Sequence, residues 1–397
     1  MKRSVMAVAV IALVLILAIP IALYQIPSVQ AQSDLEKHLI EGVPFVGHEV
    51  PMGCGMYATQ MVFEYLGINI TIPEQTYYTG WSSSFGYSPN DSLVCDAGSP
   101  GDYYFLRNLY GFNVTFWVPD VEDPYTPLNE TEWSLYWGTV KQYIAQGIPV
   151  ITNIDPFSLP YYREVLGVTS EEAGFHMIVI VGFDENEDLI YYNDPISTLY
   201  PGVENASRVA VSISDFKNAV NRTQFKKGWI CTYQRVGAPI NLKERLELAQ
   251  ERNKKRINGN FSAYSLGDYY NGLEIKLGVD GLRAYRDNIT EAWNGWETGN
   301  ESSIKKLKEG YVTPQILTFI WLRYVNEKSA VYLDEVGIEG AEMHVHFGNR
   351  SGILLKKLRN IYLVLDAGKI DNETIRQVNN NIEQIKADLD VLIALWQ

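Results

Sequence analysis

The sequence has few histidines, few cysteines and a shortage of basic residues. Its 397 residues include 5 His and 3 Cys, and 33 Lys and Arg stand against 47 Asp and Glu, which gives a net charge of −14. This balance argues against a nucleic-acid partner, because affinity for phosphate depends on clustered Lys and Arg. Three cysteines exclude a disulfide-dense scaffold. Phosphate-binding glycine loops and dinucleotide fingerprints are missing, and nothing in the sequence implies a cofactor.

The composition is otherwise that of a folded globular protein. Apolar residues make up 46% of the chain and charged residues 20%, close to the average for soluble proteins. This excludes a disordered, collagen-like or polytopic membrane protein. The length has room for two or three domains of about 100 to 200 residues each.

Residues 1–31 have the pattern of an export signal. Lys2 and Arg3 precede an apolar run over residues 5–24, and a small-residue site follows at residues 29–31. The apolar run is also long enough to span a bilayer. The pattern therefore predicts either a cleaved signal peptide or an N-terminal membrane tether, and in both cases an extracellular or cell-surface protein.

Glycosylation sequons agree with an outside location. The pattern Asn-x-Ser/Thr occurs eleven times, always after the leader. In an oxidising compartment two of three cysteines tend to pair, and the odd thiol stands out as reactive. The predicted glycosylation sites are Asn69, Asn90, Asn113, Asn129, Asn205, Asn221, Asn260, Asn288, Asn300, Asn349 and Asn372.

The chain after the leader divides near residue 240. Residues 32–240 alternate helix signals with apolar runs bounded by turn residues, which predicts an α+β domain. Residues 241–397 predict an all-α helical bundle, because apolar residues recur every three or four positions. The clearest stripes, over 353–365 and 375–396, predict an αα-hairpin. Further helices are expected over 242–256, 281–296 and 313–336.

Cys54 lies where a helix is expected to begin. Apolar residues from Ala58 to Leu66 recur at helical spacing, and Gly67 is a suitable C-terminal stop. At the first turn of a helix, free N–H groups and the positive end of the dipole favour a thiolate over a thiol. The spacing alone is equally consistent with a small buried cysteine in a turn.

His176 and Asp194 are the candidate partners of that thiol. A nucleophilic thiolate needs a general base and acid, normally histidine, and His176 opens a buried strand over 177–183. A hairpin of this strand with residues 189–194 places position 178 opposite 194, which makes His176 and Asp194 diagonal neighbours. A carboxylate there can orient the imidazole. Without a nucleophile nearby, a structural histidine and a turn-forming Asp-Pro would be the simpler interpretation.

The motifs around these residues resemble a known family. They are similar to the papain-like fold of the butirosin biosynthesis protein H N-terminal family, which is related to the bacteriocin-leader-processing cysteine peptidases of transporters. The resemblance covers residues 42–236, and residues 277–293 are similar to the helical domain that accompanies it. The matching motifs are Cys54-Gly55 at a helix start, Gly147 to Tyr161, His176 before Val181-Gly-Phe-Asp184, and Tyr191-Tyr-Asn-Asp-Pro195.

This resemblance implies a Cys-His-Asp triad in a papain-like domain followed by a helical domain. Cys54 is then the nucleophile, His176 the general base and acid, and Asp194 the group that orients the imidazole. The related peptidases carry an oxyanion-donating glutamine ahead of the cysteine, where this sequence has His48. A histidine N–H can also donate to an oxyanion, although the change leaves room for a different substrate or a lost activity. With Cys54 as nucleophile, Cys95 and Cys231 are left to form a disulfide.

Two other clusters have both a functional and a structural interpretation. Glu342, His344 and His346 alternate as on one strand face and offer three metal ligands, but without a fourth ligand a solvated structural role is favoured and no metal is expected. A cluster of five aromatic residues follows the helix that is expected to begin at Cys54, and it either lines a peptide or acyl groove or packs in a core. They are Tyr77, Tyr78, Trp81, Phe85 and Tyr87.

Three functions are compatible with these features. The leading hypothesis is a secreted or membrane-tethered cysteine hydrolase that acts on peptide or amide bonds through a thioester. The second is an acyltransferase that uses the same triad to pass an acyl group to an amine. The third is an inactive cell-surface binding protein on a papain-like frame. The sequence does not indicate an oligomeric state.

Overall fold

The computed structural model describes residues 35–47, 49, 53–83, 85–88, 94–95, 100–119, 126–171, 173–195, 205–223, 226–259, 275–296, 302, 305–367 and 372–397. The predicted leader, the candidate oxyanion residue His48 and the sequons at Asn90, Asn260 and Asn300 lie outside the described residues. Within the described ranges, no helix is long and apolar enough to cross a membrane. Residues Lys37–Gln397 form one compact unit.

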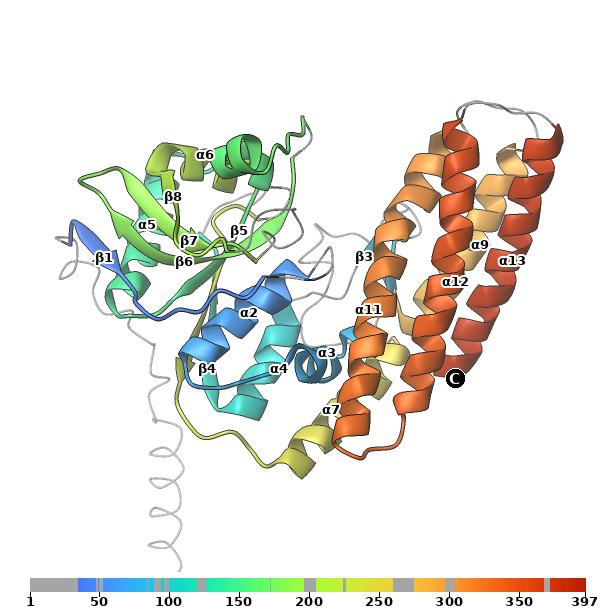
Figure 1. Ribbon diagram of the computed structural model, residues 1–397, viewed down its shortest axis with the longest axis horizontal. Coiled ribbons are helices and arrows are strands. Elements are labelled where there is room, and N and C mark those ends of the chain that lie inside the picture. Colours follow the sequence, from blue (N-terminus) through green and yellow to red (C-terminus); the bar gives the residue numbers. More distant parts are fainter. Residues whose placement is uncertain are drawn as a thin grey trace, which may run out of the picture. The chain divides into compact units, whose positions relative to one another are not determined.

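A seven-stranded antiparallel sheet forms the centre of the α+β region (Figure 1). Its strands run in the order β4-β9-β5-β6-β7-β8, and β1 also pairs with β6. The sheet therefore joins strands that are far apart in the sequence. The strands are β1 (Lys37–Leu39), β4 (Phe112–Trp117), β5 (Val150–Ile154), β6 (His176–Asp184), β7 (Leu189–Asn193), β8 (Val209–Ser212) and β9 (Ile230–Arg235).

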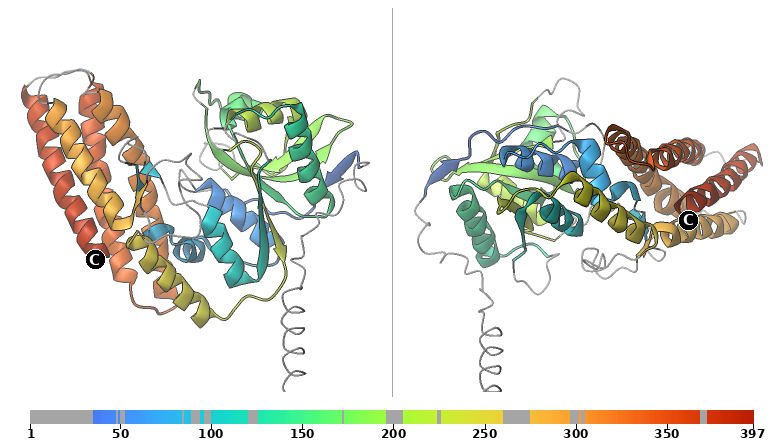
Figure 2. Two further views of the ribbon diagram at one scale, coloured as in Figure 1. Left: turned by 180° about the vertical axis from the view of Figure 1, so that it is seen from behind. Right: turned by 90° about the horizontal axis from the view of Figure 1, so that it is seen from below.

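Helices pack on both faces of this sheet (Figure 2), which explains the unbroken apolar run of β6. Met177 and Val179 pack in one core with residues of α2 and α4, whereas Ile178 and Ile180 pack in another with residues of α5 and α6. Alternate residues of a strand point to opposite faces, so both sets of side chains are buried. The helices are α2 (Cys54–Tyr65), α4 (Pro100–Tyr110), α5 (Glu130–Ala145) and α6 (Ile213–Arg222).

Local capping signals set the ends of these helices. The Asn129 side chain accepts hydrogen bonds from the backbone N–H groups of Thr131 and Glu132, and the Glu132 carboxylate accepts one in return from the Asn129 N–H. This capping box starts α5. At the end of α2, Gly67 has the positive φ of 80° that favours glycine, as the sequence predicts.

The described part of the C-terminal region is mainly helical, as predicted, and the short strand β10 (Lys276–Leu277) is its one described strand. The expected αα-hairpin is present, although its first helix begins at Ala341 rather than near residue 353. The stripe from Val378 to Leu392 is buried in the bundle core. The predicted division near residue 240 falls just before α7, and contacts join both sides of it in one unit. The helices are α7 (Leu242–Ile257), α9 (Gly278–Trp296), α11 (Thr313–Glu335), α12 (Ala341–Asp366) and α13 (Asn372–Trp396).

The aromatic residues between 77 and 87 fill the junction between the two regions rather than a groove. All five are at least 96% buried, and α3 (Ile72–Thr79), which carries the first two, packs against α11. The hydroxyl groups of Tyr78 and Tyr332 are 2.5 Å apart, and the Trp81 and Trp321 rings lie 5.6 Å apart. A second small sheet, β10-β2-β3, adds to the junction; it consists of β2 (Gly86–Tyr87), β3 (Val94–Cys95) and β10 (Lys276–Leu277).

Candidate active site

Cys54 is the first residue of α2, as the sequence predicts. Its side chain is buried, with 7% of its surface exposed. The backbone N–H groups of Met56 and Tyr57 donate to the Gly53 carbonyl at 3.0 and 3.1 Å and close the first turn. The first N–H groups of a helix have no intrahelical partner and form the positive end of its dipole. Cys54 therefore lies at the positive end of the α2 dipole.

His176 and Asp194 form a buried hydrogen-bonded pair. The His176 Nε2 lies 2.7 Å from Asp194 Oδ1, and the two residues are 2% and 0% exposed. The predicted hairpin register holds at this end, since Val179 pairs with Asn193. A β-bulge next to Gly182 shifts the register by one residue nearer the turn, so the pairing differs there without changing the His-Asp contact.

The electrostatics of this pair determine the charge of the imidazole. Burial by itself lowers the pKa of His176, because a charged ring loses its hydration. The Asp194 carboxylate and its hydrogen bond, together with a hydrogen bond to Cys54, outweigh burial and raise the pKa of His176 from 6.5 to about 10. Since Nε2 is bonded to Asp194, Nδ1 is the nitrogen left for the Cys54 sulfur. The protonated ring at neutral pH is suited to a thiolate partner.

Tyr162 is a fourth residue of the site that the sequence did not indicate. Its hydroxyl donates to Asp194 Oδ2 at 2.8 Å, while Oδ1 of the same carboxylate bonds His176. The backbone N–H of Asp194 donates to the Ala206 carbonyl at 2.9 Å. Both carboxylate oxygens are thus satisfied in a dry environment, which keeps Asp194 in place. Tyr162 lies in a single π-helical turn, Tyr161–Val165, a local feature often found at functional sites.

Asp155 fixes the chain that leads into His176. Its buried carboxylate accepts hydrogen bonds from the Gly174 backbone N–H at 2.8 Å and from the Ser158 hydroxyl at 2.6 Å. The Arg222 guanidinium lies 3.3 Å from the same carboxylate. Gly174 has no space for a side chain, since a Cβ there would lie 2.9 Å from Pro156. Asp155 therefore anchors the chain at Gly174, two residues before His176.

The predicted disulfide between Cys95 and Cys231 is wrong. Cys231 is a free thiol, 1% exposed, in the sheet core on β9. Cys95 belongs to β3, which pairs in the separate small sheet. The two cysteines therefore lie in different sheets, which the number of cysteines in the sequence could not reveal. Burial raises the pKa of the Cys231 thiol well above its usual range, so Cys231 is an inert core residue.

The strand-face interpretation of Glu342, His344 and His346 is also wrong, because all three lie in α12. His344 is buried rather than solvated, and its Nδ1 donates to Asn326 Oδ1 at 2.7 Å. Burial lowers the pKa of His344 to about 4, so the ring is neutral. Across the described residues, no group of three or more His, Cys, Asp and Glu is arranged to hold a metal ion.

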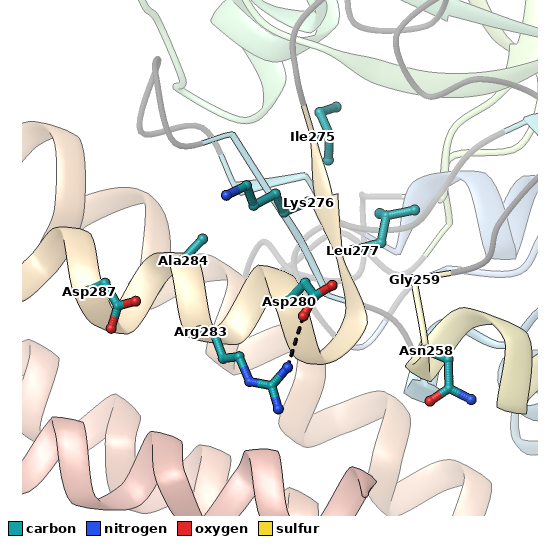
Figure 3. A pocket seen from close by; sticks show the side chains of 9 residues that line it. All are labelled: Asn258, Gly259, Ile275, Lys276, Leu277, Asp280, Arg283, Ala284 and Asp287. Atoms are coloured by element: carbon teal, nitrogen blue, oxygen red, sulfur yellow. Dashed lines mark hydrogen bonds and ion pairs between the residues drawn. The ribbon is translucent and has the colours of Figure 1, made fainter.

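A surface hollow of about 520 Å³ lies beside the first turns of α9 (Figure 3). Its lining comes from residues 258–259, 275–277 and α9, and does not include the triad. Arg283 and Asp280 form an exposed ion pair at 3.0 Å on its wall. The two charges neutralise each other, so we assign the hollow no binding role.

Comparison with known proteins places this geometry in a family. The profile of a family described as peptidase C39-like matches residues 27–227, just over half of the chain. No curated protein matches the sequence. The matched residues include Cys54, His176 and Asp194. The match agrees with the predicted relation to leader-processing cysteine peptidases. The narrower resemblance to the butirosin family stays a prediction. The chain belongs to the peptidase C39-like family.

Proposed function

We propose that the protein is a secreted or membrane-tethered cysteine hydrolase that cleaves peptide or amide bonds. The observation that carries the proposal is the contact of Cys54 with a protonated His176 ring, held from its other side by Asp194. Membership of a peptidase family supports the same class of chemistry. Because three separate elements assemble one buried triad, catalysis is favoured over binding on an inactive frame.

The geometry supports a two-step mechanism through a thioester. The Cys54 sulfur attacks the carbonyl carbon, a C–S bond forms, and the carbonyl electron pair moves to oxygen, where the Cys54 backbone N–H can donate. His176 gives its proton to the leaving amine as the C–N bond breaks. Water then attacks the thioester and returns a proton to His176, and the thiolate leaves. An acyltransferase would differ only in using an amine in place of water.

Alkylation tests the proposed nucleophile. Iodoacetamide at pH 7 is expected to modify Cys54 about tenfold faster than free cysteine, because the helix start and the His176 cation favour the thiolate. Cys231 serves as an internal control, since its buried thiol should react only after unfolding. Peptide mapping locates the label, and Cys54→Ala should leave the folded protein unlabelled at this position. Labelling of Cys54 no faster than free cysteine would refute the catalytic proposal.

The products separate the two reaction types. Incubation with a peptide thioester, with and without a primary amine, is followed by mass spectrometry. Hydrolysis predicts the free acid as the main product in both samples, whereas an acyltransferase predicts the amide when the amine is present. Predominant amide formation at low amine concentration would replace the hydrolase proposal with the transferase.

The exposure of the sequons supports the proposed location outside the cell. Eight of the sequon asparagines lie within the described residues, and each of them has some exposed surface. Asn69, Asn129, Asn205, Asn349 and Asn372 are exposed, whereas Asn113, Asn221 and Asn288 are half-buried. Sites for a bulky, solvated glycan must be on the surface.

Glycan occupancy is expected to follow this exposure. In protein purified from its own host, glycopeptide mapping should find glycan at Asn349, which is exposed on α12. Asn288 should be unoccupied, because it is half-buried and its Nδ2, the atom that would carry the glycan, donates to the Tyr87 hydroxyl at 3.1 Å. A protein without any glycan would argue against the proposed location.

A further inference from the structure

Glu49, which precedes α2 in the sequence, contacts α11, a helix of the C-terminal region. Lys328 Nζ lies 3.2 Å from Glu49 Oε2, and the Tyr324 hydroxyl donates to the same oxygen at 3.3 Å. Tyr57, three residues after Cys54, accepts a hydrogen bond from the Glu49 backbone N–H at 3.3 Å. The Tyr57 and Tyr324 hydroxyls are 2.7 Å apart. These contacts link Tyr57, in the first turn of α2, to Glu49 on one side and to α11 on the other.

The direction of each hydrogen bond in this ring follows from the groups involved. A backbone N–H only donates and a carboxylate only accepts. The single hydroxyl proton of Tyr324 goes to Glu49, so Tyr57 must donate to Tyr324. Each tyrosine hydroxyl then donates once and accepts once, and the ring is complete. Burial raises the pKa of both tyrosines, so both hydroxyls keep their protons near neutral pH.

Apolar packing holds the same turn of α2 from another side. Met56 and Tyr57, two and three residues after Cys54, are 0% and 2% exposed. They form a small core with Trp81, Trp321 and Val325, of which the last two belong to α11. The first turn of α2 is therefore positioned by side chains of the helical region, beyond its own helix and the sheet.

We propose that Tyr324 and Lys328 are positioning residues, through which α11 holds the first turn of α2 and directs the Cys54 backbone N–H at the oxyanion of the substrate. This inference rests on the proposed function and assigns a role to the helical region. Oxyanion stabilisation depends strongly on donor geometry, so a small displacement of this turn slows acylation. Alkylation of the thiolate forms no oxyanion, and it does not need the same alignment.

The two reactions of Cys54 test the proposal in the full-length protein. With p-nitrophenyl acetate, the sulfur forms a thioester and releases p-nitrophenolate, which is measured as a burst. Tyr324→Phe is expected to slow this acylation about 3- to 10-fold, the effect of losing one or two hydrogen bonds. Its alkylation by iodoacetamide should stay within about twofold of wild type and keep the same pH profile. Lys328→Gln should have a smaller effect, since a partly exposed ion pair contributes little.

Tyr332→Phe is the matched control. It removes a Tyr–Tyr hydrogen bond from the same helix, 2.5 Å long and made with Tyr78 on α3, without touching the start of α2. It should lower the melting temperature and leave both rates unchanged. Acylation of Tyr324→Phe at the wild-type rate, or equal loss of both reactions, would overturn the positioning role. Wild-type protein that reacts in neither assay would refute the proposed function and the inference with it.

Discussion

Replacing His176 with alanine is expected to slow acylation of Cys54 by p-nitrophenyl acetate by about 10²- to 10⁴-fold, the usual contribution of a general acid and base. The variant loses the cation that faces the thiol, and it also loses the group that delivers the proton. Its alkylation by iodoacetamide should depend on pH differently from that of wild type, because the charged ring that faces the thiol is lost. The measurement is the burst rate together with a pH series of alkylation rates.

Stability gives an independent check on the same residue. The pKa of His176 is raised from 6.5 to about 10 in the folded protein, so the folded state binds the proton more tightly than the unfolded state. The resulting stabilisation is fully present below about pH 6.5 and is lost as the pH rises toward 10. The free energy of unfolding should therefore fall across this range in wild type and fall less in His176→Ala. Equal pH slopes, or equal alkylation profiles, would contradict a charged His176.

Asp194→Asn is expected to lower the acylation rate by up to about 10⁴-fold while preserving the shape of the site. Asparagine keeps a hydrogen-bonding oxygen but removes the charge that outweighs burial at His176. Without this charge, burial should dominate, so the pKa of His176 should fall below 6.5 and the ring should be neutral at pH 7. Titration of the imidazole by NMR measures this change directly.

Asp388→Asn is the control for loss of a buried carboxylate. Asp388 is 5% exposed and pairs with Arg350 and Lys357 in the helical region, without contact to the triad. It should reduce stability but leave the acylation rate and the His176 titration unchanged. If Asp194→Asn retained a charged His176 at pH 7, the orienting carboxylate would have to be another group.

Local sequence patterns predicted several parts of the site because they depend on neighbouring residues. The apolar run after His176 indicated a buried strand, and the cores on its two sides confirm this. The periodicity from Ala58 to Leu66 placed Cys54 at a helix start. The hairpin length brought His176 and Asp194 together despite an unforeseen bulge, because the bulge lies nearer the turn.

The errors arose where a pattern was ambiguous or where a long-range contact decided the outcome. The alternation around His344 resembles a strand, but the buried positions His344, Phe347, Gly348 and Ser351 have helical spacing. This stripe is only partly apolar, so hydrophobic periodicity did not show it. The disulfide prediction treated two remaining cysteines as a pair, whereas pairing depends on distance in the fold.

By itself, the sequence determined the α+β and helical regions, the position of Cys54 at a helix start and the His-Asp hairpin, because each follows from residues close along the chain. The tertiary structure alone decided which elements meet. Packing of α2 on β6 brings Cys54 to His176, a π-helical turn brings Tyr162 to Asp194, and α11 brings Tyr324 to Glu49. These contacts join residues far apart in the sequence, and burial of shared apolar surface, which no local pattern encodes, determines them.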